Sequence, residues 1–142
     1  LLGCIRAAGA ELLDMTQRAV ASAVNVEDAL RRGLVAYFQF ISEHQQSWSL
    51  LRHESSLLAG PAGAEIEATR QQQTNLMTSL MGAQLPNTTT RQREAAAEII
   101  VGACERLATW RERHDDVSNE EAAEYVLQST WFGLQRLTEP VF

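Results

Sequence analysis

Residues 93–110 read REAAAEIIVGACERLATW, and residues 118–137 read SNEEAAEYVLQSTWFGLQRL after a short turn. Apolar residues recur in both stretches at the three- and four-residue spacings of an amphipathic α-helix. Each apolar stripe is wider than one neighbouring helix requires, and small residues in both stretches allow two backbones to approach closely. The two helices therefore form either the core of an all-helical monomer or half of a four-helix bundle that a second copy completes.

Helical periodicity extends through the rest of the 142 residues, whereas strand signals are nearly absent. The predicted helices run to about residues 24, 41, 59, 84, 114 and 139, with breaks at polar residues 42–46, at Gly60-Pro61 and at the loop 85–90. Asn25 with Asp28, and Ser118 with Glu121, have the spacing of a capping box. We predict an all-α fold, an orthogonal and antiparallel bundle of about six helices in a single domain over residues 1–142.

Composition narrows the class of protein. The net charge is −6 and the pI is near 5.0. An acidic surface repels phosphates, so we do not expect these residues by themselves to bind nucleic acid. The two cysteines, Cys4 and Cys104, form no disulfide framework and fit a reducing cytoplasm. No apolar run approaches the length of a membrane span, so no membrane partner is expected.

The order and lengths of these helices, and above all the two C-terminal stretches quoted above, resemble the C-terminal part of a tetracycline-repressor (TetR) family transcriptional regulator. The resemblance covers the whole chain but rests on helix lengths and positions, because the family's specific motif is an N-terminal helix-turn-helix that this sequence does not contain. It implies that residues 1–24 are the connector helix leaving an absent DNA-binding domain. It also implies that the next three helices frame a pocket for a small-molecule effector and that the last two form an intersubunit four-helix bundle.

The same resemblance implies a mechanism. A homodimer places two recognition helices in successive major grooves of operator DNA, through the absent N-terminal domain. An effector that prefers one of two conformers shifts the connector helix and changes the spacing of the two DNA-reading heads. We therefore expect a transcriptional repressor rather than an enzyme.

The residues themselves suggest where the effector binds. His44, Trp48 and Arg52 follow one another at i,i+4 spacing and share one helix face, which suits a mostly apolar ligand with an orienting polar group. Methionines and leucines at helical spacing are equally typical of ordinary core packing. The predicted effector-binding residues are Phe38, Ile41, His44, Trp48, Arg52, Gln73, Leu76, Met77, Leu80 and Ile99.

The predicted dimer interface lies on the last two helices. Its residues are Ile100, Cys104, Leu107, Val126, Thr130, Trp131 and Leu134.

Catalytic and metal sites are not expected from the spacing of the reactive residues. His44 and His53 are too far apart in sequence to share a helix face as a metal pair, and no Glu-x-x-His motif occurs. Neither cysteine has a basic residue at helical spacing that would activate its thiol as a nucleophile. We predict no catalytic residue, no metal and no cofactor. One alternative is a helical homodimeric interaction module without a ligand, and another is a four-helix-bundle cofactor protein.

Overall fold

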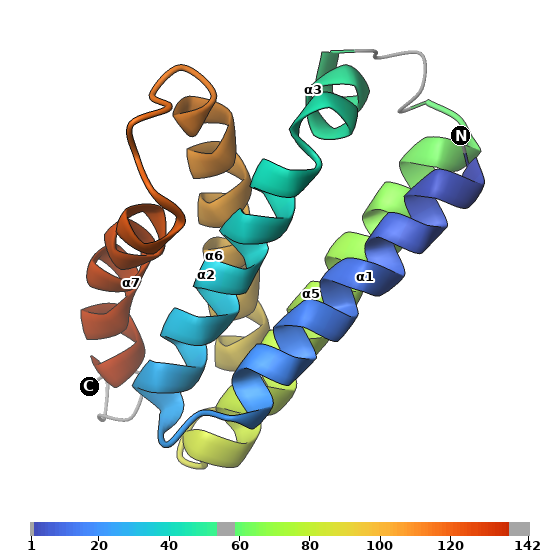
Figure 1. Cartoon of the computed structure of the whole chain (residues 1–142). Coiled ribbons are helices and arrows are strands. Elements are labelled where there is room, and N and C mark those ends of the chain that lie inside the picture. Colours follow the sequence, from blue (N-terminus) through green and yellow to red (C-terminus); the bar gives the residue numbers. More distant parts are fainter. Residues whose placement is uncertain (1, 54–58, 137–142) are drawn as a thin grey trace.

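The computed structural model describes residues 2–53 and 59–136, and within these ranges it contains helices and no strands (Figure 1). The all-α fold class is confirmed. The helices are α1 (Leu2–Ala21), α2 (Val26–Glu43), α3 (Gln45–His53), α5 (Pro61–Gln84), α6 (Thr90–Arg111) and α7 (Asn119–Arg136).

The predicted breaks are present where the sequence changes character. α2 ends at Glu43, and the backbone N–H of His44 bonds the carbonyls of Phe40 and Ile41 before α3 begins. Pro61 occupies the first turn of α5, where its missing N–H leaves no bond unmade. The predicted end of the third helix at residue 59 follows residues 54–58, which lie outside the described ranges.

Two helices are shorter than predicted. α1 ends at Ala21 rather than near residue 24, and α6 ends at Arg111 rather than near residue 114. After α6 the N–H groups of residues 112–114 bond carbonyls three positions back, which tightens the chain into turns. Helix ends commonly close in this way, and periodicity alone does not reveal it.

The caps at Asn25 and Ser118 form only in part. The Asn25 side chain accepts a hydrogen bond from the Asp28 N–H at 2.8 Å. The Asp28 carboxylate, however, accepts from the N–H of Val24 at 3.1 Å and not from that of Asn25. Ser118 accepts the N–H of Glu121 at 3.0 Å. The reciprocal capping box lies instead at the start of α6, between Thr89 and Gln92, where the sequence analysis placed a loop.

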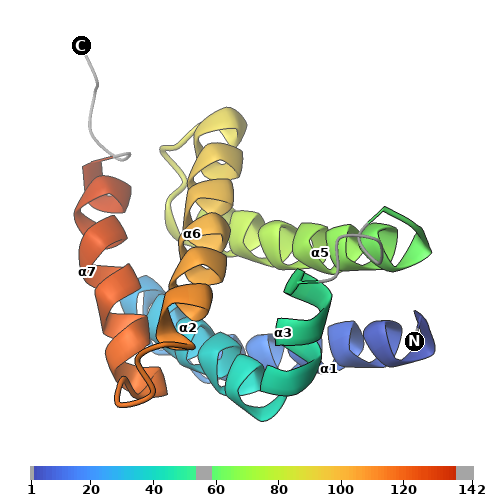
Figure 2. The same ribbon diagram turned by 90° about the horizontal axis from the view of Figure 1, so that it is seen from above.

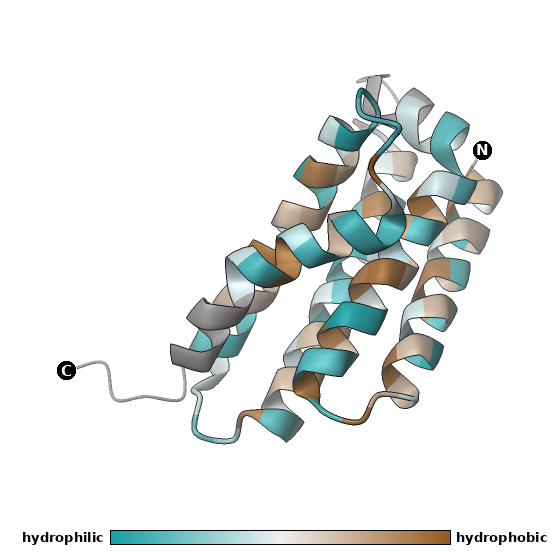
Figure 3. Cartoon of the chain, turned by 60° about the vertical axis from the view of Figure 1, so that its left-hand side comes forward, coloured by the Kyte–Doolittle hydropathy of each residue, from teal (hydrophilic) through white to brown (hydrophobic). Residues whose placement is uncertain are grey.

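α2 is the central helix, and it packs against α1, α5, α6 and α7 (Figures 1 and 2). Its inward face carries Phe38, which is fully buried, together with Leu30, Leu34 and Ile41. Figure 3 shows hydrophilic and hydrophobic residues alternating around the helices. None of the described helices is long and apolar enough to cross a membrane.

α1 lies along α5, and the two helices run in the same direction (Figure 1). The Arg6 guanidinium pairs with Glu65 at 2.8 Å, and one turn further on Gly9 faces Thr69. A Cβ atom at Gly9 would lie only 2.4 Å from Thr69 Oγ1. Glycine at this position therefore permits the close approach of the two backbones.

Candidate functional site

The predicted effector residues divide between the interior and the surface. Phe38 and Ile41 belong to the buried core, and Trp48 and Met77 pack against it. His44, Gln73, Leu76 and Leu80 are half-buried, whereas the side chain of Arg52 is outside the described part of the structure. Ile99 is 64% exposed. The predicted residues of α2, α3 and α5 whose side chains are described are thus buried or half-buried, whereas Ile99 lies on the surface of α6.

Three buried polar atoms have no hydrogen-bond partner among the described residues: Tyr37 Oη, Trp48 Nε1 and Gln73 Nε2. One comes from each of α2, α3 and α5. Buried polar groups are normally hydrogen-bonded, because leaving such a group without a partner costs about 1–3 kcal/mol. All three groups are hydrogen-bond donors. An acceptor atom within reach of any one of them would complete its hydrogen bond.

Tyr37 is a residue that the sequence analysis missed. Burial raises the pKa of its phenol well above the usual range, so the hydroxyl keeps its proton and remains a donor. Its ring packs edge-on against Phe38, with 5.4 Å between the ring centroids. The adjacent aromatic pair in AYFQF was a visible signal, but periodicity favoured Phe38 alone for the inward face.

An ion pair beside Tyr37 joins α5 to α6. Arg70 Nε donates to Glu105 Oε1 at 2.5 Å, and Arg70 Nη2 donates to Glu105 Oε2 at 3.1 Å. This two-point contact fixes the guanidinium plane, and the hydrogen bonds that Arg70 donates to Glu105 raise the pKa of Arg70. Both charges act on the Tyr37 phenol, which places it beside the pair.

Two hollows are open at the surface. One runs between α1 and α5 beside Gly9 and Thr69. The other lies where α2, α6 and the start of α7 meet, beside Arg111 and Asn119, and the predicted residue Ile41 lines it. The polar atoms of Tyr37, Trp48 and Gln73, by contrast, are each shielded from solvent.

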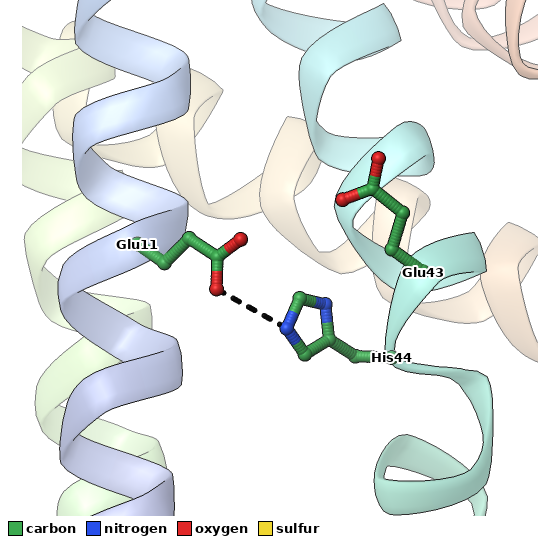
Figure 4. A group of neighbouring side chains, drawn as sticks. All are labelled: Glu11, Glu43 and His44. Carbon is green, nitrogen blue, oxygen red and sulfur yellow. Dashed lines mark ion pairs between the residues drawn. The ribbon is translucent and has the colours of Figure 1, made fainter.

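A separate group of ionisable side chains joins α1 to the break between α2 and α3 (Figure 4). Glu11 reaches from α1 toward His44, with 3.2 Å between Glu11 Oε2 and His44 Nε2. One ligand-type atom from each of Glu11, Glu43 and His44 lies within 4.8 Å of the others. The sequence analysis considered metal binding only within one helix, and so it did not pair His44 with Glu11.

The family model described as the tetracyclin repressor-like C-terminal domain matches residues 26–133. The chain belongs to this family. The resemblance predicted from the helix pattern is thereby confirmed, and the match supports a regulator of the TetR family. A search of curated proteins finds no match.

In this family member, the helices predicted to dimerise already bury much of their apolar surface within one protomer. Ile100, Cys104 and Val126 are 2%, 4% and 3% exposed and belong to the protomer's own core. Leu107 and Thr130 are half-buried, and the side chains of Trp131 and Leu134 lie outside the described part. The dimer interface stays a prediction, but the three buried side chains have no free surface to offer it.

Burial also decides the chemistry of Cys104. It raises the pKa of the thiol to about 12, so the side chain stays a neutral thiol at physiological pH. Cys104 is therefore a small core residue and not a nucleophile.

Proposed function

We propose that this chain is the effector-binding and dimerisation part of a transcriptional repressor whose DNA-binding domain precedes α1. The carrying observation is the set of three buried, unpartnered donors at Tyr37, Trp48 and Gln73, in a chain that belongs to the tetracyclin repressor-like C-terminal family. The effector is a mostly apolar molecule with acceptor oxygens. Aromatic and methionine side chains bind its body, and the donors orient its acceptor atoms.

The closed interior supports a change of conformation on binding. Phe38 and Met81 are fully buried, so an effector must move side chains or helices to reach the donors. α1 packs against both α2 and α5, so a shift of these helices is transmitted to it. In the proposed regulator α1 connects to the DNA-binding domain, and its displacement weakens operator binding.

The test is a thermal-shift screen of apolar compounds with carbonyl or carboxylate groups, followed by calorimetric titration of each hit. Tyr37→Phe removes one donor and keeps the ring, so it should weaken binding of a hit by about tenfold, as expected for one hydrogen bond of roughly 1.4 kcal/mol. Tyr125→Phe is the matched control, because Tyr125 is exposed on α7. An equal loss in both variants would exclude Tyr37 as a ligand-binding residue.

The rival function is an interaction module without a ligand. The observation in its favour is that the predicted pocket region is filled by its own side chains, with Trp48 and Met77 packed on the core. If no compound of the screen raises the melting temperature, this rival is the better description.

A further inference from the structure

We propose that Glu11, Glu43 and His44 form a binding site for a divalent transition-metal ion of the zinc class. The three side chains come from α1, from the last residue of α2 and from the residue between α2 and α3. The site is separate from the buried donors, and it stands or falls independently of the effector.

The two imidazole nitrogens of His44 have different partners. Nδ1 lies 2.9 Å from the carbonyl oxygen of Phe40, and a carbonyl oxygen can only accept, so Nδ1 carries a proton. In the neutral ring Nε2 is then a bare lone pair, and it faces Glu11 Oε2 at 3.2 Å. Two acceptors at this distance repel each other unless a cation joins them. That cation is either a proton on Nε2 or a metal ion.

The charges around His44 favour a divalent ion over a single proton. Two carboxylates, Glu11 and Glu43, stand beside one imidazole (Figure 4). A proton on His44 balances one negative charge, whereas a divalent ion balances both. One imidazole and two carboxylates are also a ligand set that zinc accepts, with a remaining position for water.

Neighbouring residues contact His44 and Glu43, as is usual for side chains that bind a metal ion. His44 is fixed by the Nδ1 contact and by stacking on Phe40, with 4.2 Å between ring centroids. Gln39 Nε2 donates to Glu43 Oε1 at 3.1 Å. Ligands at about 2.0–2.1 Å from a tetrahedral ion lie about 3.3 Å apart, whereas these ligand atoms lie within 4.8 Å of one another, so the group must contract by up to about 1.5 Å. The exposed, flexible Glu43 side chain can supply that movement.

His114 provides a natural matched control. Its Nδ1 lies 3.0 Å from the carbonyl of Trp110, and its ring stacks on Trp110 with 4.2 Å between centroids. The local geometry is that of His44, but among the described residues no metal-ligand group forms around it. The two histidines differ in the carboxylates that surround them.

The consequence is a link between α1 and the α2–α3 break. A bound ion would hold Glu11 of α1 to His44 and stabilise the arrangement in which α1 lies against α2. Because only the folded chain brings the three ligands together, the ion should raise the melting temperature.

The experiment is a titration of the full chain with Zn²⁺ by calorimetry and with Co²⁺ by visible absorption. A Cys4→Ser background removes the exposed thiol, which would otherwise bind the same ions. We expect one ion per chain, a weakening of at least about tenfold in His44→Gln and Glu11→Gln, and no more than a twofold change in His114→Gln. Helical circular dichroism checks that each variant is folded, and Glu43→Gln, at an exposed position, gives a second test if either fails.

Absence of stoichiometric binding in the folded wild-type chain would overturn the proposal and leave a protonated His44–Glu11 ion pair. Equal affinity in His44→Gln and His114→Gln would overturn it as well. Neither readout uses effector or DNA, so failure of the proposed regulator function would not be mistaken for failure of the metal site.

Discussion

Arg111 Nη2 donates to the backbone carbonyl of Phe38 at 2.9 Å, which ties the last residue of α6 to the central helix α2. The same guanidinium donates to Ser42 Oγ and to Asn119 Oδ1, both at 2.7 Å, so one side chain joins α2, α6 and the start of α7. It also lies over the Phe38 ring, with its carbon 5.2 Å from the centroid. Arg111 is 9% exposed, so these hydrogen bonds are made by a largely buried side chain.

Removing this guanidinium should destabilise the fold strongly. Arg111→Met keeps a long side chain but leaves the Phe38 carbonyl without this donor, and hydrogen bonds from a charged group contribute about 1.5–3 kcal/mol each. We expect the free energy of unfolding, measured by urea denaturation, to fall by about 2–4 kcal/mol. Arg106→Met, at an exposed position on the same helix, should change it by less than about 0.5 kcal/mol. Similar effects in both variants would contradict the role of Arg111.

Acidification should release the start of α2. Asp28 accepts a bond from Arg32 Nε at 2.8 Å and one from the Val24 N–H at 3.1 Å, and these bonds, the one from Arg32 first, lower the pKa of Asp28. A carboxyl whose pKa is lower in the folded state stabilises the fold above its ordinary pKa of 3.8, and this contribution disappears as the pH falls through the folded-state value. The stability difference between wild type and Asp28→Asn in urea should therefore shrink from pH 7 to pH 3. A difference that stays constant with pH would contradict this account.

The close contact of α1 and α5 predicts coupling between Gly9 and Thr69. Gly9→Ala gains about 1 kcal/mol of helix propensity, but its Cβ would clash with Thr69 Oγ1, which bonds the Glu65 carbonyl at 3.1 Å. In a Thr69→Ala background the oxygen is gone, and Gly9→Ala should stabilise the protein. A double-mutant cycle of thermal unfolding should give a coupling of about 1 kcal/mol, whereas additive effects would mean that the helices separate freely.

The two cysteines should react very differently. Cys4 is exposed near the start of α1, whereas Cys104 is buried and the pKa of its thiol is about 12. A thiol-specific reagent at pH 8 should modify Cys4 rapidly and Cys104 only in denaturant. Cys4→Ser should abolish the rapid phase, and a rapid phase that survives it would show that the core around Cys104 opens readily.

Helical periodicity predicted the fold well because each helix buries one continuous stripe, as Leu30, Leu34 and Phe38 do on α2. The sites were harder to predict because they depend on contacts between helices. Arg111 stands in the last turn of α6, and only the packing of α2 and α7 shows its three partners. Likewise, nothing in the spacing of the histidines indicated that Glu11 would lie beside His44.

The apolar stripes of α6 and α7 were too wide to divide between core and dimer from sequence. Ile100 and Cys104 took the core side, which leaves Ile99 64% exposed on α6 and Tyr125 44% exposed on α7. Ala95 and Gly102 lie on the exposed side of α6 with Ile99, and a Cβ at Gly102 would meet no atom within 4 Å. We therefore expect the proposed dimer to use this exposed stripe.

Light scattering on surface variants tests that expectation. Ile99→Glu should shift the chain from dimer to monomer, because a charge would be buried at the seam without a partner. Gly102→Trp should do the same by steric exclusion, since the protomer itself has room for the side chain. Val24→Glu is the matched control: Val24 is 84% exposed at the turn between α1 and α2, so its substitution should leave the mass unchanged. If Ile99→Glu and Gly102→Trp both remain dimeric, the copies associate through another surface, and the exposed stripe of α6 is excluded as the interface.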